Sequence, residues 1–321
     1  MRSIFTVNCK DSRSRLSDQL TPMTNRDYLK KMTQRRKKRN RLRRLVLAVC
    51  ILVVAMAFLI PDGGVHDTFV GNEDESSSYA VAIGDDWSAY ATAQTNKDLD
   101  ENMIGYTGFT VSFNPVAHIP NWVAWTVSAD RLGHPVVSRS EGSFSTDRTV
   151  QGCATAADYR RSGYDRGHMA PAADMKWNRQ AMKDCFMFTN IAPQTTTLNT
   201  GAWNKLEQAC RNIASVDSLG RAVVICGPVM TQGYRATIGD SQVMVPPAFF
   251  KVVLYRRVDG SPATIGFIMN NGKVDGGMQK CALTVDEVED ITGHDFFTML
   301  PDSIEQQIES VFDFYNFSTG R

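Results

Sequence analysis

The chain has 321 residues, of which 43% are hydrophobic and 21% are charged, and its formal net charge is +1. This length allows one large domain with an appendage, and the charge balance excludes a uniformly basic nucleic-acid-binding protein. The charges are unevenly spread, because residues 1–44 carry 15 Lys and Arg against 3 Asp and Glu. The two ends of the chain are therefore expected to lie in different surroundings.

An unbroken apolar run, residues 45–60 (LVLAVCILVVAMAFLI), follows this basic segment. As a helix it spans roughly 24 Å, and flanking arginines can snorkel to cover the rest of the hydrocarbon core. We interpret it as an uncleaved transmembrane signal anchor, with secretion after signal cleavage as the alternative. Residues 1–44 are then cytoplasmic, and the rest of the chain lies on the exported, periplasmic or extracellular side. Translation could begin at Met1, Met23 or Met32.

Residues 61–101 are predicted to be an acidic linker, because ten of them are Asp or Glu and Lys97 is the single basic residue. The remaining segment, residues 102–321, holds 19 basic and 21 acidic residues and is predicted to be the folded domain. A nearly neutral domain can attract phosphate only through a local basic patch.

Five cysteines fall in the exported part, where disulfides are permitted. Their number is odd, so at least one is free or pairs between chains, and sequence alone does not assign the connectivity. None forms a CxxC pair, which argues against a structural zinc site. The five are Cys153, Cys185, Cys210, Cys226 and Cys281.

Strand signals, rich in aromatic and β-branched residues, occur at residues 121–127, 222–225, 249–255 and 263–269. Helices are predicted at 201–213, at 284–292, where Thr284 and Glu287 form a capping box, and at 301–312. Strands and helices that mix without strict alternation indicate an α+β fold with an antiparallel sheet.

Residues 164–171 (YDRGHMAP) carry the most informative local pattern. In an extended segment Arg166 and His168 project from the same face, and Gly167 allows a close approach from behind. A guanidinium beside an imidazole can hold a phosphate while the imidazole takes a proton from water. A purely structural role is the alternative for an isolated histidine, but its neighbours favour catalysis.

Two more polar segments follow, residues 189–194 (TNIAPQ) and 198–207 (LNTGAWNKLE). On a helix Glu207 and Arg211 share one face, and Asn199 lies at the N-terminal end, where asparagine is a good cap. A capped helix with a surface ion pair explains these residues as well as a site does, when they are considered alone.

Together, DRGH, TNIAPQ and LNTGAWNKLE resemble the DNA/RNA non-specific endonuclease family, over about residues 104–305. These are ββα-metal (His-Me finger) nucleases, which include secreted bacterial sugar-non-specific nucleases and mitochondrial endonuclease G. The resemblance implies a central antiparallel sheet flanked by helices, here preceded by one N-terminal transmembrane helix.

The resemblance also implies a role for each matching residue. His168 is in the position of the general base, and Asn199 in that of the one protein ligand of a Mg²⁺ ion, for which Mn²⁺ could substitute. Glu207 is similar to the carboxylate that orients the waters of the metal. The phosphate-contacting and supporting positions are Arg166, Arg211, Asn190 and Gln194.

The sequence departs from the family pattern in two places. Many members have a phosphate-binding arginine just before an aromatic residue, but Gly142 and Ser143 precede Phe144 here. Arg139 or Arg148 could substitute. Secreted bacterial members close a disulfide near the position of Cys281; here a pairing with Cys226 and a free thiol both stay open.

We therefore expect a Mg²⁺-dependent, sugar-non-specific endonuclease that hydrolyses DNA and RNA. Neither a recognition helix nor a zinc finger is evident, and contacts to the phosphate backbone carry no base information. One alternative is a membrane-tethered nucleic-acid-binding module of weak or no activity, and another is a phosphodiesterase for small nucleotides. A homodimer, an inhibitor protein and a preference for DNA or RNA are left open.

Overall fold

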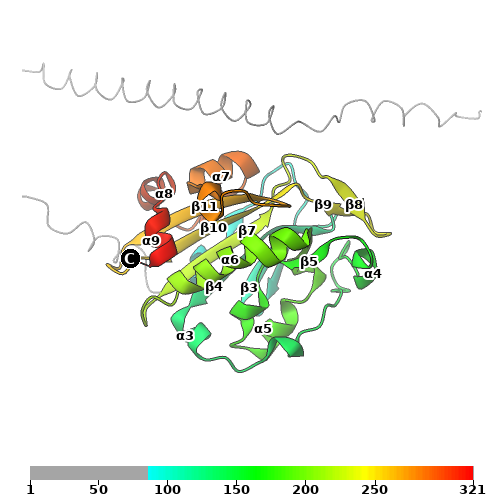
Figure 1. The fold of residues 1–321 in the computed structure, drawn as a ribbon, viewed down its shortest axis with the longest axis horizontal. Coiled ribbons are helices and arrows are strands. Elements are labelled where there is room, and N and C mark those ends of the chain that lie inside the picture. The colour runs from blue at the N-terminus through cyan, green and yellow to red at the C-terminus, as the bar shows by residue number, and fades with distance from the viewer. Residues whose placement is uncertain (1–85, 321) are drawn as a thin grey trace, which may run out of the picture. The chain divides into compact units, whose positions relative to one another are not determined.

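The structure is a computed structural model that describes residues 86–320 (Figure 1). The basic segment 1–44, the predicted anchor 45–60 and residues 61–85 of the linker lie outside the described residues. Within residues 86–320, no helix has the length and hydropathy needed to cross a bilayer.

A central sheet organises the described part of the chain. Its seven strands are antiparallel to their neighbours, in the order β12-β11-β10-β7-β4-β3-β2. Their bounds are β2 Asn102–Tyr106, β3 Phe109–Asn114, β4 Ile119–Ser128, β7 Arg221–Pro228, β10 Ala248–Arg256, β11 Pro262–Asn270 and β12 Ala282–Leu283. The predicted α+β class with a central antiparallel sheet is confirmed.

Three two-stranded antiparallel sheets accompany it. They are β1 (Ala93–Gln94) with β13 (Asp295–Phe296), β5 (Asp165–His168) with β6 (Ile191–Gln194), and β8 (Ala236–Ile238) with β9 (Val243–Val245). The α-helices of residues 86–320 are α3 Ala129–Gly133, α4 Ala156–Tyr159, α5 Arg179–Asp184, α6 Asn204–Ile213, α7 Val285–Thr292, α8 Asp302–Glu309 and α9 Phe314–Thr319. The chain also forms short helical turns, such as η1 (Trp87–Tyr90) and η3 (Ala172–Met175).

The two faces of the central sheet are covered by different helices. Side chains alternate along a strand, so Lys251 and Phe267, which are paired in the register of β10 and β11, point to one face. Helix α6 packs on this face against β4, β7 and β10 (Figure 1). Gly266 points to the opposite face, where an added Cβ would lie 2.6 Å from Cγ2 of Val288 in α7. Helices α7 and α8 therefore belong to the side opposite α6.

Helical structure around α6 begins earlier than the sequence predicts. A π-helical segment, η5 (Leu198–Trp203), runs directly into α6, with a kink at Gly201 (φ −101°, ψ −108°). In α6 the spacing of Leu206, Cys210 and Ile213 places them on one buried stripe. The stripe fixes the rotation of the helix on the sheet and so decides which residues face the site.

The other predicted elements match with shifted ends. The predicted strands fall within β4, β7, β10 and β11, and the capping box of Thr284 and Glu287 is present at the start of α7. The helix predicted at 301–312 instead ends at Glu309. A new helix, α9, starts after Asp313, whose side chain accepts a hydrogen bond from the backbone N–H of Asn316 and so caps the new helix.

Residues 87–101, which the sequence places in the acidic linker, pack on the domain. Strand β1 pairs with β13, and Trp87 is buried. The indole Nε1 of Trp122, on the central strand β4, donates to Oγ1 of Thr95 over 2.7 Å. A buried indole N–H needs an acceptor, and this segment supplies one.

All five cysteines of the described chain are free thiols. Cys226 lies in β7 and Cys281 precedes β12, and the two strands β10 and β11 lie between them. The pairing of Cys226 with Cys281 is therefore wrong for this fold, and the free-thiol alternative holds.

Candidate active site

The hairpin-like pair β5–β6 and the helical segment from η5 into α6 bring the predicted site residues together. His168 ends β5 and pairs with Ile191, the first residue of β6. The indole Nε1 of Trp203, at the end of η5, donates to the backbone carbonyl of His168 over 3.3 Å. The strand that carries the histidine is thereby fixed to the helix that carries Glu207.

His168 is buried, with 8% of its surface exposed. Its ring lies 5.3 Å from the ring of Phe144 and 4.8 Å, edge to face, from that of Phe186. Burial, aided by the positive charge of Arg139 and opposed by a backbone hydrogen bond at Arg166, lowers the pKa of His168 to about 3. The imidazole is therefore neutral near pH 7.

The free nitrogen of this imidazole is Nε2. Among residues 86–320 it has no hydrogen-bond partner although it is buried. The backbone hydrogen bond at Arg166 then falls to Nδ1 as the donor, which assigns the lone pair to Nε2. A buried, unpaired acceptor is costly in a protein interior and marks a group kept available for a ligand.

Asn199 is oriented by an aspartate from β5. Its Nδ2 donates to Oδ2 of Asp165 over 3.0 Å, and the hydroxyl of Thr196 donates to the other oxygen of the same carboxylate over 2.8 Å. Asn199 lies inside the helical segment η5, with its backbone N–H bonded to the carbonyl of Thr195, and is not the cap of a helix. Its amide oxygen is left as an acceptor, since Nδ2 is the atom held by Asp165.

Glu207, on the first turn of α6, has a perturbed carboxyl group. Burial raises its pKa to about 7, against the opposing charges of Lys251, Arg211 and Arg139, while Asp174 adds to the rise. The group therefore titrates near neutral pH, and the cations around it decide how much of it is ionised.

Lys251 is the strongest of those cations and was not identified from the sequence as a site residue. It is fully buried in β10, and its Nζ lies 4.3 Å from the ring of Trp203 and 5.2 Å from that of Trp125. Burial lowers the pKa of Lys251, but the thiols of Cys226 on β7 and Cys210 on α6 and the carboxyl group of Glu207 outweigh it and leave that pKa raised. Its one sequence signal is a lysine inside an otherwise apolar strand, at residues 248–254 (AFFKVVL).

Arg211 pairs with Asp174 and not with Glu207, so the predicted alternative of a surface ion pair on α6 is wrong. Its Nη1 donates to Oδ1 of Asp174 over 2.9 Å, and the two side chains are 13% and 1% exposed. The other oxygen of Asp174 accepts from Nε1 of Trp125 over 2.9 Å. Arg211 is thus held beside Glu207 by a buried carboxylate.

Two further arginines lie against the aromatic rings that enclose His168. The guanidinium of Arg166 lies 4.9 Å from the ring of Phe144, and that of Arg139 lies 5.4 Å from the ring of Phe186. The charge of Arg139 acts on both His168 and Glu207. Two guanidinium groups therefore lie against the rings that enclose the neutral imidazole.

Asn190 and Gln194 both lie close to the backbone around His168, but of the two only Asn190 forms side-chain hydrogen bonds with other described residues. The Asn190 amide bonds to the backbone N–H and carbonyl of Ala170 and to the carbonyl of Cys185, over 2.8–2.9 Å. Gln194 is fully buried against Gly167, where an added Cβ would lie 2.2 Å from its Oε1. Glycine at 167 is therefore required by close packing behind the histidine.

The sequence and fold place the chain among known proteins. The model of a family described as DNA/RNA non-specific endonuclease matches residues 88–303. The chain belongs to this family. It is 34% identical to the mitochondrial nuclease EXOG of Danio rerio, over 61% of this chain and 60% of that protein. It is 32% identical to the mitochondrial endonuclease G of Homo sapiens, over 58% of this chain and 66% of that protein.

A solved structure of an EndoG/EndoGI complex has the same fold as this family member. The TM-score is 0.59 at 26% identity, and the match covers 66% of this chain and 90% of that one. The chain spans about three fifths to two thirds of the length of the two curated relatives named above.

The buried Asp174–Arg211 pair yields a stability prediction. Asp174→Ala leaves a buried guanidinium unpaired, and we expect it to lower the free energy of unfolding by about 3–5 kcal/mol. The exposed pair of Arg179 and Glu141 is the control, and Glu141→Ala should cost no more than about 1 kcal/mol. Urea unfolding at pH 7 measures both. Equal losses in the two variants would contradict a buried, energetically important pair.

Proposed function

We propose that this chain is a divalent-metal-dependent endonuclease that hydrolyses the phosphodiester backbone of DNA and RNA, with His168 as the general base. The observation that carries the proposal is the unpaired Nε2 of a buried, neutral imidazole beside arginine side chains. Membership of a nuclease family supports it. The same proposal includes a more specific fold assignment, in which β5, β6 and α6 form a ββα-metal core.

The protein groups supply the proton transfer and the phosphate binding. Nε2 of His168 accepts a proton from the attacking water, for which a neutral imidazole is required. Arg166 holds the phosphate near that nitrogen, and Arg139 stands in for the arginine that the family has before the aromatic at Phe144. Arg211 is kept close by Asp174 and adds positive charge where the phosphorane is most negative.

The residues present fit a divalent metal. Asn199 offers a neutral amide oxygen of fixed direction, because its Nδ2 is held by Asp165. Glu207 offers a carboxylate that accepts hydrogen bonds from waters. Such a sparse, all-oxygen donor set suits Mg²⁺, which keeps most of its waters, and Mn²⁺ could substitute. When bound, the ion would supply Lewis-acid stabilisation of the phosphate and the leaving oxygen.

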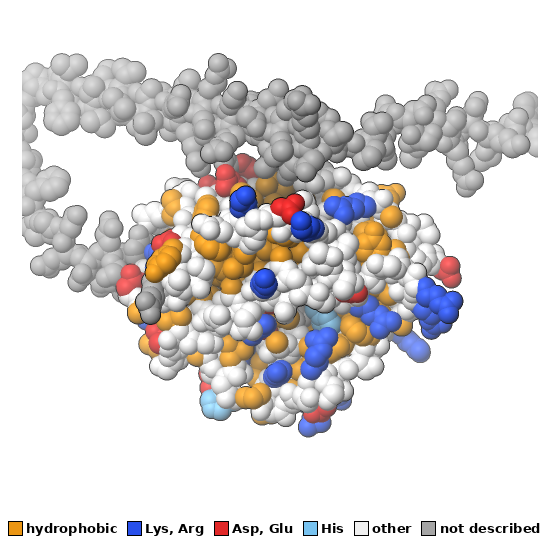
Figure 2. Space-filling view, viewed as in Figure 1, with side chains coloured by type: hydrophobic (Ala, Val, Ile, Leu, Met, Phe, Trp, Pro, Cys, Tyr) orange, Lys and Arg blue, Asp and Glu red, His pale blue; other side chains and the backbone are white. Residues whose placement is uncertain are grey.

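Contacts to the backbone alone account for the lack of base selectivity. Lys and Arg side chains gather over the part of the surface that carries β5, α4 and α5 (Figure 2). Charges of this kind position a nucleic acid by its phosphates without reading its bases. DNA and RNA are therefore both expected as substrates.

The main prediction concerns His168. We expect His168→Ala to lower kcat/KM by about 10²–10⁴, because a general base contributes about that factor. The purified full-length chain in detergent is assayed on supercoiled plasmid and total RNA, with Mg²⁺ or with EDTA. His134→Ala is the control, since that histidine is 78% exposed and distant from the site in sequence.

The assay also separates the rival functions. Plasmid that is bound in a shift assay but never cut, with any divalent metal, would favour a binding module. Cleavage of small model diesters without cleavage of polymers would favour a phosphodiesterase for small nucleotides.

The pH dependence should follow Glu207 and not His168. The pKa of His168 is about 3, so the base stays free across the neutral range, whereas Glu207 ionises near pH 7. If its ionised form is required, kcat/KM rises through about pH 7, and Glu207→Gln removes this rise. Lys251→Met should move the rise to higher pH, because the cation that favours the ionised form is gone.

The readout in this experiment is the position of the acidic limb of kcat/KM, not the activity at one pH. A Lys251→Met variant that loses activity equally at every pH would have a packing defect, and the role of its charge would be rejected. The other charged groups that act on Glu207 are Asp174, Arg211 and Arg139.

For localisation, we propose that residues 45–60 anchor the chain in the membrane with the nuclease domain on the exported side. The apolar run and the preceding basic segment support this. Deleting residues 45–60 should move the protein from the membrane pellet to the soluble fraction. A mature chain whose N-terminal peptide begins after residue 60 would instead indicate cleavage and secretion.

A further inference from the structure

Two neighbouring arginines with exposed side chains stand at the end of helix α4. Arg160 is the C-cap residue of the helix, and Arg161 follows it. Within residues 86–320 neither guanidinium takes part in a hydrogen bond or an ion pair, whereas those of Arg179 and Arg211 are paired with carboxylates. The surface over α4 is rich in Lys and Arg side chains (Figure 2). The charges of the two arginines are therefore available to an anion from outside the described chain.

The backbone of Arg161 has a conformation that arginine seldom adopts. Its φ is 55°, in the left-handed region that suits glycine or asparagine. Other non-glycine residues of the described chain with a positive φ have side chains that are bonded or buried inside the fold: His118, Gln242 and Phe297. The exposed side chain of Arg161 has no such contact among residues 86–320. Strain that no internal contact offsets points to a role in binding a ligand.

A buried carboxylate fixes the segment that carries the two arginines. Asp158 of α4 is 3% exposed, and it accepts hydrogen bonds from the backbone N–H and the hydroxyl of both Thr155 and Ser241, over 2.8–3.0 Å. Ser241 is in the turn between β8 and β9. In the same turn an added Cβ at Gly239 would lie 2.3 Å from Cα of Asp158. The end of α4 is thus held against this hairpin, so the arginines are positioned before any ligand binds.

A row of aromatic rings connects the arginine pair with the candidate active site. Its contacts, between ring centroids, are His168 to Phe144 over 5.3 Å, Phe144 to Phe188 over 5.9 Å and Phe188 to Tyr159 over 5.3 Å. Tyr159 directly precedes Arg160. At the other end of the row, the guanidinium of Arg166 lies 4.9 Å from the ring of Phe144. Arg166 and the arginine pair therefore lie at opposite ends of one short path.

We propose that Arg160 and Arg161 form a second phosphate-binding subsite, which holds a nucleic-acid strand away from the phosphate that is cut. The inference rests on the proposed nuclease function and adds that the substrate is a polymer. Each strand of a duplex carries one phosphate about every 3.4 Å along the axis, so the row of rings covers no more than about five phosphates. Guanidinium groups bind phosphates in bidentate fashion and do not read bases. A strand of several nucleotides reaches both sites, whereas a small diester reaches one.

The test measures the binding of a short DNA duplex to the full-length chain in detergent, over a range of salt concentrations. EDTA is present, so that cleavage does not interfere. Arg161→Asn removes the charge but keeps a residue that tolerates the left-handed conformation. It should lower the slope of log K against log salt by about 1 and raise Kd about fivefold near physiological salt. Arg161→Lys keeps the charge and should retain most of the slope.

Thermal unfolding of the same variants separates ligand binding from packing. Arg161→Asn should raise Tm by about 1–3 °C, because asparagine relieves the strain at this position. Arg160→Ala should lower the salt slope by about 1 with no rise in Tm, since Arg160 has a negative φ. This second variant also covers the case in which a change at residue 161 prevents folding.

Lys97→Asn is the control with the same change in charge. Lys97 is exposed, and its neighbour Asn96 donates its backbone N–H to Nδ1 of His294 over 3.0 Å. His294 lies beside β13 and far in sequence from α4. The control should leave both the salt slope and Kd unchanged.

An unchanged slope in both Arg161→Asn and Arg160→Ala would overturn the proposal, even if the wild type cuts plasmid and RNA. A fall in Tm of Arg161→Asn with unchanged binding would show that the arginine serves packing, and would also overturn it. Failure of the wild type to cut with any divalent metal would reject the nuclease function alone, because the binding comparison is made in EDTA. The two failures are therefore distinguishable.

Discussion

The active-site side of the fold depends on the buried ammonium of Lys251. A lysine on a central strand, between Trp125 and Trp203 and without exposure to water, is stable only with negative charge nearby. The groups that raise its pKa against burial are, largest first, the thiol of Cys226 on β7, the thiol of Cys210 and the carboxyl group of Glu207 on α6, and Asp174 on η3. The position of α6 on the sheet is therefore constrained by electrostatic interactions as well as by the packing of its apolar stripe.

The same burial acts in opposite directions on the two titratable groups of the site. It lowers the pKa of His168 and raises that of Glu207, since each charged form is penalised. A neutral histidine is the form that a general base requires. A half-ionised carboxylate is not the form that is useful beside a metal, so Glu207 needs the cations around it to favour its ionised form. The cation near His168 is compatible with the neutral imidazole but is not needed for it.

The elements and the local site pattern were predictable from sequence because their signals are short in range. Alternation placed Arg166 and His168 on one face, and β-branched runs located β4, β7, β10 and β11. The partners of the site residues were not predictable. Arg211 was assigned to Glu207 by helical spacing, but Asp174, 37 residues away in sequence, forms the pair. Lys251 was not identified as a site residue, because the role of a lysine within an apolar run is ambiguous until the helix that packs over it is known.

The predicted boundary between the acidic linker and the folded domain, after residue 101, differs from the structure for a similar reason. Residues 87–101 have the acidity of a linker, but Thr95 in this segment accepts the hydrogen bond of the buried Trp122 indole, and β1 pairs with β13. Composition describes a segment by itself, whereas its place in the fold is decided by the unsatisfied groups that it meets.

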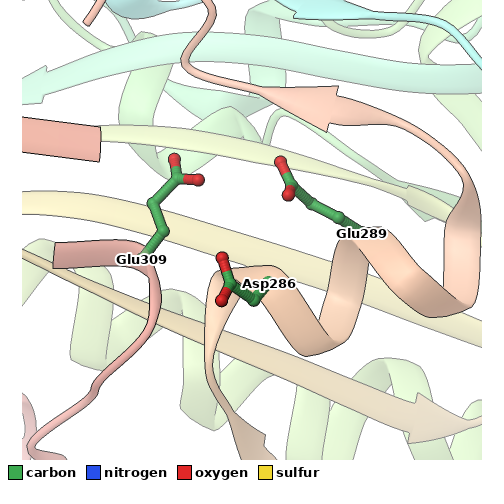
Figure 3. Close-up of side chains that lie close together, drawn as sticks. All are labelled: Asp286, Glu289 and Glu309. Atoms are coloured by element: carbon green, nitrogen blue, oxygen red, sulfur yellow. The ribbon is translucent and has the colours of Figure 1, made fainter. Parts of the chain in front are cut away.

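Burial raises the pKa of carboxyl groups on both sides of the central sheet, but the charges next to those groups differ. On the α6 face, the carboxyl group of Glu207 is buried and a lysine from the sheet opposes the cost. On the opposite face (Figure 3), Glu309 is buried and Glu289 is half-buried, and burial is the largest cause that raises the pKa of each. The cations around Glu207 keep its ionisation near neutral pH, whereas the carboxylates near Glu289 and Glu309 add to the rise in their pKa values.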